Sequence, residues 1–241
     1  MKKTKIICTI GPASNDEKTI EKMIKAGMNV ARLNFSHGNH ESHKIEIENI
    51  KKVREKLGEP IAIMLDTKGP EFRIGKFEGG KACIKPNSEF TFTSKQVLGN
   101  EHIVSVSPKS IIPNLKKGDT ILVANGLLSF KVLQEGKDEV KCKAISGGEM
   151  FDNKSMNFPD KIVVKDYLSN NDKNDLLFGI KNNIDLVACS FVSSAKDASD
   201  VRKFLNQNGG KDVDIIAKLE NQSGIDNIDE ILKIVDGIMI G

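Results

Sequence analysis

Polar side chains occupy every second position of the segment 30–38, VARLNFSHG, where they could bind a group such as phosphate or carboxylate. The apolar residues between them give the near-alternating pattern of a strand, so Arg32, Asn34 and Ser36 project to one side. A guanidinium can grip phosphate or carboxylate through two parallel hydrogen bonds, and the other two side chains supply oxygen ligands. The alternative is an edge strand whose polar face is only hydrated.

Two further pairs of polar residues follow apolar runs that are typical of buried strands. Asp66 and Thr67 come after the run 61–65, and Lys218 and Glu220 come after the run 215–217. Lys218 and Glu220 are two residues apart, so they face the same way on a strand, and a nearby cation keeps Glu220 ionised. Carboxylate oxygens with few fixed protein contacts suit a Mg²⁺ that also holds substrate phosphate. A surface ion pair is the alternative, and the apolar run before Lys218 favours burial.

The segments that would carry these residues alternate between strand and helix patterns. Short apolar runs predict strands, and stripes at helical spacing between them predict helices, which together indicate a parallel sheet. A capping box of Ser14 and Glu17 is predicted to begin the first helix, Gly27 to end it, and Ser169 to cap a later one. The predicted strands are 6–10, 30–35, 61–65, 185–191, 214–217 and 237–240, and the predicted helices begin near 17, 41, 172, 197 and 228.

This alternation stops between residues 69 and 160, where no capped helix of useful length is found. Short strand-like pieces separated by Gly-containing turns replace it, which predicts a small all-β barrel inserted into the α/β domain. The joints are predicted at 68–70 and 157–159. The predicted strands of the insert are 90–92, 103–106, 120–123, 127–132 and 140–145.

The overall composition excludes several classes of protein. The formal net charge is +3, from 36 basic and 33 acidic residues, which is too small to indicate nucleic acid or a membrane surface as a partner. With no Trp and one Tyr, there is little to stack on bases. The apolar run at the start is too short for a signal peptide, and no later run could span a bilayer. The four cysteines are far apart and are interpreted as core residues of a cytoplasmic protein.

Three other patterns are rejected as sites. Residues 75–82, GKFEGGKA, nearly match a phosphate-binding loop, but Ala82 lacks the required hydroxyl, and the segment is interpreted as a hairpin turn. Adjacent Ser36 and His37 point to opposite faces of an extended chain and make a poor nucleophile–base pair. His37, His40 and His43 have no nearby Cys to complete a zinc site, and they are expected to be exposed.

Five motifs together resemble the pyruvate kinase family: TKIICTIGPAS at 4–14, VARLNFSHG at 30–38, LDTKGPE at 65–71, IAKLENQ at 216–222 and DGIMI at 236–240. Their order matches the family's, and they span nearly the whole chain. The resemblance implies a (β/α)8 TIM-type barrel, of which about six strands are present, with an inserted β-barrel lid. It also implies transfer of phosphate from phosphoenolpyruvate to ADP in glycolysis, with Mg²⁺ and K⁺ as cofactors. The expected segments are 1–69 and 159–241 for the catalytic barrel and 70–158 for the lid.

The resemblance assigns roles to individual residues of this chain. Arg32 would contact substrate, and Lys218 would stabilise the phosphoryl group in flight, whose charged transition state needs positioning and positive charge. Glu220 would bind Mg²⁺. The K⁺ ligands would be Asn34, Ser36, Asp66 and Thr67, and the nucleotide contacts would be Asn34, Phe35, Ser36, His37, Arg73 and Lys154.

The resemblance also carries expectations about the whole protein. The chain is expected to be the N-terminal part of a cytoplasmic homo-oligomer, a tetramer in the family, and to be inactive by itself because a second Mg²⁺ carboxylate lies beyond Gly241. Departures from the family pattern are Ala124–Asn125, Ser193 and Gly241. Two alternatives stay open: a Mg²⁺-dependent lyase or aldolase of the phosphoenolpyruvate/pyruvate barrel type, and a non-catalytic binding fragment. The inserted β domain counts against the lyase, whose chemistry needs no nucleotide lid.

Overall fold

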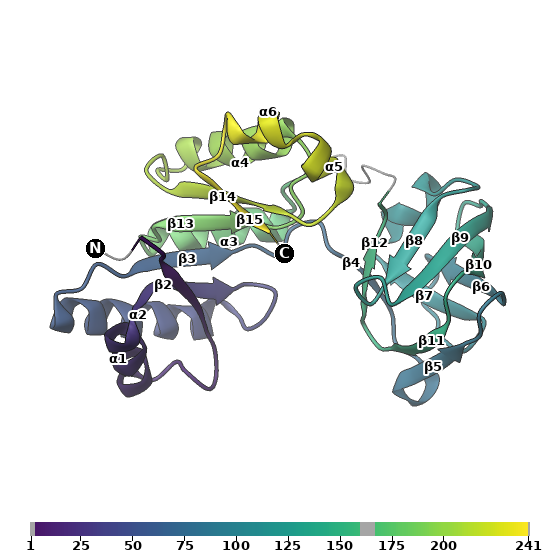
Figure 1. Ribbon diagram of the computed structural model, residues 1–241, viewed down its shortest axis with the longest axis horizontal. Helices are drawn as coiled ribbons and strands as arrows, with labels where there is room; N and C mark the ends of the chain where they lie inside the picture. The colour runs from purple at the N-terminus through teal and green to yellow at the C-terminus, as the bar shows by residue number, and fades with distance from the viewer. Residues whose placement is uncertain (1–2, 160–166, 241) are drawn as a thin grey trace. The chain divides into compact units, whose positions relative to one another are not determined.

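The computed structural model describes residues 3–159 and 167–240, which divide into two compact units (Figure 1). The α/β unit contains residues 3–70, 167–220 and 224–240, and the β unit contains residues 71–159 together with 221–223. Gly241, one of the departures from the family pattern, lies outside the described residues. Each unit has its own hydrophobic core.

The α/β unit is built on a curled parallel sheet of six strands whose spatial order follows the chain (Figure 1). All six predicted strands are confirmed. Sequential parallel order is the pattern that repeated βα units produce, because each helix returns the chain to the same end of the sheet. The strands are β1 (Ile6–Ile10), β2 (Met28–Asn34), β3 (Ala62–Asp66), β13 (Leu186–Cys189), β14 (Asp214–Leu219) and β15 (Gly237–Ile240).

Helices connect these strands, and local side-chain caps define where they begin. Asn39, Ser169 and Ser194 each form a capping box, and Gly27 and Gly58 end their helices in the left-handed conformation. The helices are α1 (Glu17–Ala26), α2 (His40–Leu57), α3 (Asn170–Lys181), α4 (Ala195–Gln207), α5 (Gln222–Asp226) and α6 (Ile228–Leu232).

Two predictions about helix residues were wrong. Asp16, not Ser14, caps α1, because its carboxylate accepts a hydrogen bond from the Thr19 amide at 3.0 Å. The Ser14 hydroxyl instead accepts from the Gly11 amide at 3.2 Å in the preceding turn. His43, expected to be exposed, is buried on the inner face of α2.

Burial of the central strand β3 determines the environment of the residues at its end. Ile63, Met64, Leu65 and Asp66 are all buried, so side chains on both faces of the strand are covered. This is typical of a parallel sheet enclosed by other elements. A carboxylate at the end of such a strand must find cationic or hydrogen-bonding partners inside the unit.

The β unit is a closed barrel in the strand order β10-β6-β7-β4-β12-β8-β9. The five predicted strands are confirmed, and four more of three or four residues each are present. The barrel strands are β4 (Phe72–Ile74), β6 (Glu89–Thr93), β7 (Ile103–Ser107), β8 (Thr120–Val123), β9 (Leu128–Gln134), β10 (Glu139–Ala144) and β12 (Ser155–Asn157). A separate pair is formed by β5 (Lys81–Ile84) and β11 (Gly148–Phe151), and two 3₁₀ helices span Glu78–Gly80 and Lys109–Asn114.

The interpretation of residues 75–82 as a hairpin turn was wrong. The segment contains the 3₁₀ helix Glu78–Gly80, and β5, which follows it, pairs with β11 and not with β4. Ala124 and Asn125, by contrast, do form a tight turn: they join β8 to β9 with φ values of 53° and 57°.

The barrel core is aromatic at its centre. Phe90, Phe92 and Phe130 are fully buried, and their ring centroids lie 5.1–5.5 Å apart in tilted or edge-to-face pairs. Cys142 lies in this core, where burial raises the pKa of its thiol to about 12. Cys83 is exposed on β5, so the expectation that every cysteine is a core residue was wrong for this one.

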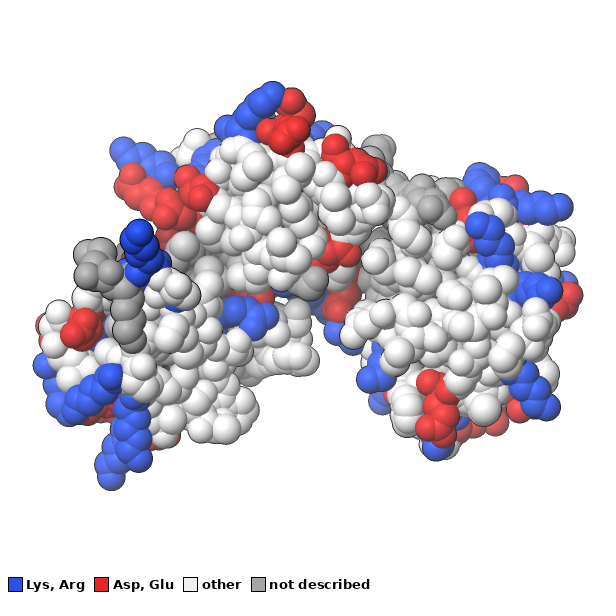
Figure 2. All heavy atoms as spheres, viewed as in Figure 1, with Lys and Arg blue, Asp and Glu red and all other residues white. Residues whose placement is uncertain are grey.

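Charged side chains of both signs are interspersed on the face drawn in Figure 2, and neither sign forms a continuous patch there. None of the helices within residues 3–159 and 167–240 combines the length and the apolar character that crossing a bilayer requires.

Candidate active site at the strand ends

The buried carboxylate of Asp66 is the centre of a polar network at the carboxyl ends of the parallel strands. Asp66 is the last residue of β3 and is 1% exposed. Arg32 of the neighbouring β2 donates from Nε to its Oδ2 at 2.6 Å, and Arg32 Nη2 lies at the same distance from that oxygen. A third nitrogen, Nη1, donates to Thr9 Oγ1 on β1 at 2.6 Å. The guanidinium is therefore held between the ends of three adjacent strands.

Lys218 of β14 approaches the same carboxylate from the other side. Its Nζ donates to Asp66 Oδ1 at 3.1 Å and to Ser190 Oγ at 2.8 Å, and its side chain is 11% exposed. Two cations therefore share one buried carboxylate, which serves as their common counter-ion. Such pairing is what makes a buried charge tolerable, since an uncompensated carboxylate in this position would be strongly destabilising.

Ser190, the residue after β13, connects Lys218 to the backbone of the Asp66–Thr67 segment. Its hydroxyl donates to Thr67 O at 2.7 Å, and its amide donates to Thr67 Oγ1 at 3.2 Å. The Ser190 carbonyl accepts from the Tyr167 hydroxyl at 2.6 Å. Burial raises the pKa of Tyr167 well above its usual range, so the hydroxyl stays a neutral donor. Ser190 is thus fixed through its side chain, its amide and its carbonyl.

Glu220 lies just beyond the end of β14, on the same side as Lys218. Its Oε1 is 3.5 Å from Lys218 Nζ, and its Oε2 accepts from the Phe191 amide at 3.0 Å. The carboxylate is thus in contact with a lysine and with a backbone donor. Glu220 therefore provides negatively charged oxygens close to the cation of Lys218.

Asn34 and Ser36 complete the site on the side of β2. Asn34 is the register partner of Asp66 in the β2–β3 pair, and its Oδ1 accepts from the Ser36 amide at 3.0 Å. Phe35 donates its amide to Asp66 O at 3.0 Å, which ties the strand end to β3. The amide and carboxylate oxygens of Asn34 and Asp66 therefore lie at neighbouring strand ends, and both are hard ligands suited to cations.

Chemically, this arrangement presents two fixed cations beside oxygen ligands from several strands. A guanidinium and an ammonium held by one carboxylate can bind an anionic substrate without first having to be ordered. Strand-end residues at the carboxyl edge of a parallel α/β sheet are where such folds carry their chemistry.

The family model described as "Pyruvate kinase, barrel domain" matches residues 1–241. The chain belongs to the pyruvate kinase family. A pyruvate kinase of Clostridium perfringens is 44% identical over 241 residues, and one of Staphylococcus haemolyticus is 44% identical over 242 residues. The crystal structure of a pyruvate kinase from Cryptosporidium parvum superposes with a TM-score of 0.90 at 38% identity over 99% of this chain.

The chain spans about half the length of the pyruvate kinases that it matches. It covers 51% of the C. perfringens protein, 41% of the S. haemolyticus protein and 50% of the C. parvum chain. The structural similarity extends over both units, because the superposed region includes nearly all of this chain.

The structure brings together most of the predicted site residues of the α/β unit. Two further predicted residues belong to the β unit and are described there. Seven residues of the α/β unit lie at the strand ends described above: Arg32, Asn34, Ser36, Asp66, Thr67, Lys218 and Glu220. His37 is exposed in the loop after β2. Arg73 and Lys154 belong to the β unit, where Arg73 Nη1 donates to Asn153 O at 2.6 Å and Lys154 Nζ lies 5.9 Å from the Phe151 ring centroid.

The site also contains three residues that were not predicted from the sequence: Thr9, Ser190 and Tyr167. Ser190 could have been predicted from its position, because it follows an apolar strand in the same way as Asp66 and Thr67 follow the apolar residues of β3. Nothing in the spacing around Tyr167 indicates that its hydroxyl reaches Ser190. Ser193, singled out as a departure from the family, instead donates its amide to Asp197 Oδ2 at 2.9 Å beside the α4 cap.

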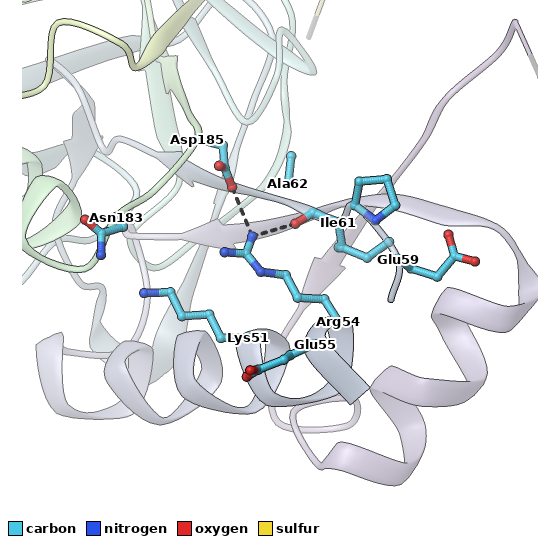
Figure 3. Close-up of a pocket in the computed structure, with 9 residues that line it drawn as sticks. Lys51, Arg54, Glu55, Glu59, Ile61, Ala62, Asn183 and Asp185 are labelled. Atoms are coloured by element: carbon cyan, nitrogen blue, oxygen red, sulfur yellow. Dashed lines mark hydrogen bonds and ion pairs between the residues drawn. The ribbon is translucent and has the colours of Figure 1, made fainter. Parts of the chain in front are cut away.

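A cavity of about 700 Å³ lies at the opposite end of β3 and does not form part of this site (Figure 3). Its lining includes Ile61 and Ala62 at the start of the strand. The two cations that point into it already bind protein groups: Lys51 donates to Asn182 O at 2.7 Å, and Arg54 to Ile61 O at 2.8 Å. These contacts join α2 to the amino ends of the strands, a stabilising role typical of that end of βα folds.

Proposed function

We propose that the protein containing this chain transfers the phosphoryl group of phosphoenolpyruvate to ADP, which yields pyruvate and ATP. The observation that carries the proposal is the meeting of Arg32 and Lys218 on buried Asp66 at the ends of β2, β3 and β14. A loose phosphoryl transition state spreads negative charge over its oxygens, so catalysis depends on positioning and on preorganised positive charge. Membership of the pyruvate kinase family supports this assignment.

Arg32 and Lys218 are proposed as the catalytic cations. Arg32 would anchor the phosphate of phosphoenolpyruvate, and Lys218 would face the phosphoryl group as the P–O bond to the enol oxygen breaks. A β-phosphate oxygen of ADP forms the new bond, and the enolate that leaves takes up a proton to give pyruvate. Asp66 would keep both cations in place throughout, because it contacts each of them directly.

Glu220 is the proposed Mg²⁺ ligand of this chain. Within the described ranges, no group of three or more His, Cys, Asp or Glu side chains is arranged to hold a metal. A single carboxylate still fits, because Mg²⁺ commonly takes one or two carboxylates and completes its shell with water and substrate phosphate. Bound there, the ion would neutralise phosphate charge. Asn34, Ser36, Asp66 and Thr67 are proposed to hold K⁺ through their oxygens.

Nucleotide binding is proposed for the segment from Asn34 to His37 together with Arg73 and Lys154. We further propose that residues 70–158 form a lid over a TIM-type barrel to which 1–69 and 159–241 contribute. A homo-oligomeric, cytoplasmic enzyme is proposed on the same family grounds. The lyase or aldolase alternative gains no support, since the curated relatives described above are pyruvate kinases.

The test uses a chimaera in which this chain replaces the matching half of the C. perfringens pyruvate kinase. The chimaera is expected to form ATP and pyruvate in equal amounts from phosphoenolpyruvate and ADP, with dependence on Mg²⁺. Pyruvate formed without ATP would support the lyase alternative. A folded chimaera with no turnover would contradict the proposal, and the parent enzyme assayed in parallel serves as the control.

A further inference from the structure

Two ionisable side chains of α2, His43 and Glu46, form a buried pair that the proposed chemistry does not use. Each residue is 6% exposed, and they lie one turn apart on the inner face of the helix. His43 Nδ1 and Glu46 Oε2 are 2.8 Å apart. Ionisable residues are seldom buried unless their interactions offset the cost of desolvation. The partners of this pair therefore indicate what it does in the fold.

The second ring nitrogen of His43 holds the loop that follows β2. Its Nε2 is 2.8 Å from the carbonyl oxygen of His37. The ring also stacks on Phe35, with centroids 4.1 Å apart and an interplanar angle of 17°. Gly38 has a φ of +75°, and a Cβ added there would come within 3.2 Å of His43 Nε2. Residues 35–38 therefore pack closely around this imidazole.

The protons in this network can be assigned from its acceptors. A backbone carbonyl can only accept, so His43 Nε2 must carry a proton and donate it to His37 O. The contact between Nδ1 and Glu46 Oε2 contains a second proton, shared by a ring nitrogen and a carboxylate oxygen. Glu46 thereby fixes the orientation of the ring, and the ring fixes the carbonyl of the loop. An acid that is hydrogen-bonded to one ring nitrogen of a histidine in this way determines what the other ring nitrogen can bind.

We propose that His43 and Glu46 are positioning residues that hold loop 35–38 in the conformation needed to bind nucleotide. The inference rests on the proposed function, because that loop carries the proposed contacts Phe35, Ser36 and His37. The pair would act through the His37 carbonyl without touching the nucleotide itself. The structure thus assigns to α2 a role in setting the affinity for ADP.

His40 offers a matched comparison one turn earlier on the same helix. It too contacts an acid, with Nε2 2.6 Å from Asp175 Oδ1, and it too stacks on a phenyl ring, that of Phe178 at 4.4 Å. Its described hydrogen bond leads to α3 and not to a carbonyl of loop 35–38. Its ring reaches the loop only at Phe35, as a tilted contact with centroids 6.2 Å apart. Replacing His40 therefore tests for the effect of losing a histidine of α2 while the hydrogen bond to the His37 carbonyl is kept.

The experiment compares His43→Asn, His43→Gln and His40→Asn in the 241-residue chain. Asparagine places its amide near the position of Nδ1 and cannot reach the His37 carbonyl, whereas glutamine places an N–H near the position of Nε2. Amide hydrogen exchange of residues 35–38 and titration with Mg²⁺ and ADP are measured for each variant. We expect His43→Asn to speed exchange in the loop and weaken ADP binding by about tenfold, the equivalent of one lost hydrogen bond. His43→Gln should recover most of both, and His40→Asn should change neither.

Unchanged loop exchange in a folded His43→Asn variant would overturn the proposal. Faster exchange with no change in a measurable ADP affinity would overturn the claim that His43 and Glu46 influence nucleotide binding. If the unmodified chain binds no ADP while His43→Asn still loosens the loop, positioning of the loop is supported and the proposed nucleotide contacts of this chain are contradicted, whereas turnover of the chimaera tests the proposed function separately. Should His43→Asn fail to fold, ¹⁵N NMR of the native chain decides: Nε2 of His43 must carry a slowly exchanging proton, and an unprotonated Nε2 would overturn the proposal.

Discussion

At the scale of single residues, Ser190 shows how the site depends on a side chain with no charge. Its buried hydroxyl donates to Thr67 O and accepts from Lys218, so Ser190→Ala would leave a buried carbonyl and an ammonium each short of one partner. We expect a loss of about 1–3 kcal/mol in the free energy of unfolding, typical of an unsatisfied buried group. Urea denaturation of the 241-residue chain measures this.

Ser88→Ala is the control for that substitution. The Ser88 hydroxyl also donates to a backbone carbonyl, that of Lys85 at 2.7 Å, but it does so at the surface, where water can replace it. We expect its effect to be within about 0.5 kcal/mol of zero. Equal losses in the two variants would show that burial of Ser190 contributes nothing.

At the scale of elements, the segment after β3 depends on a glycine that packs against the segment after β13. Gly69 has a φ of +64°, and an added Cβ would lie 2.8 Å from Ser190 O. Gly58, at the end of α2, has a nearly identical φ of +67° and open space around it. Gly58→Ala should therefore cost about 1 kcal/mol for backbone conformation alone, and Gly69→Ala should cost clearly more. Thermal unfolding of both variants checks this, and equal shifts in Tm would contradict the predicted clash.

A charge contact between α1 and α2 gives a prediction about pH. Hydrogen bonds from Lys25 and then Lys56 lower the pKa of Glu21 from its ordinary 4.5 to about 2. Because the pKa is lowered in the folded state, the contacts of ionised Glu21 stabilise the fold fully above pH 4.5, and this stabilisation is lost as the pH falls through about 2. Unfolding midpoints of the native chain and Glu21→Gln should therefore converge between pH 4.5 and 2. Parallel curves over that range would contradict the contact, and added salt should weaken it because both lysine partners are exposed.

The same scale shows what the sequence could and could not predict. Strands such as β3 and β14 were predictable because an apolar run, of five residues before Asp66 and three before Lys218, leads into two polar side chains. The short strands β4 and β12 were not, since three residues give no measurable alternation and their pairing is decided by distant partners in the barrel. Arg32, Asp66, Lys218 and Glu220 could be predicted individually from their place after strands. That Arg32 and Lys218 share Asp66 could not, because it depends on the register of β2, β3 and β14.

At the scale of the whole molecule, the two units have separate hydrophobic cores, so each should be able to fold by itself. The barrel of the β unit closes within residues 71–159 and buries Phe90, Phe92 and Phe130. We expect an isolated fragment of residues 70–159 to unfold cooperatively and to give well-dispersed amide NMR signals. Poor dispersion in the fragment, with good dispersion of the same signals in the 241-residue chain, would show that its core depends on the α/β unit.

The claim on which this account depends is that phosphoryl transfer takes place at the Arg32–Asp66–Lys218 network. The most direct measurement is turnover of the chimaera carrying Lys218→Met, compared with Lys196→Met on the exposed face of α4 as the matched control. Removing one preorganised group from a transition-state site typically lowers kcat by about 10²–10³-fold. We predict a loss of that size for Lys218→Met, with phosphoenolpyruvate binding retained through Arg32, and no change for Lys196→Met. Near-normal turnover of a folded Lys218→Met chimaera would contradict the account.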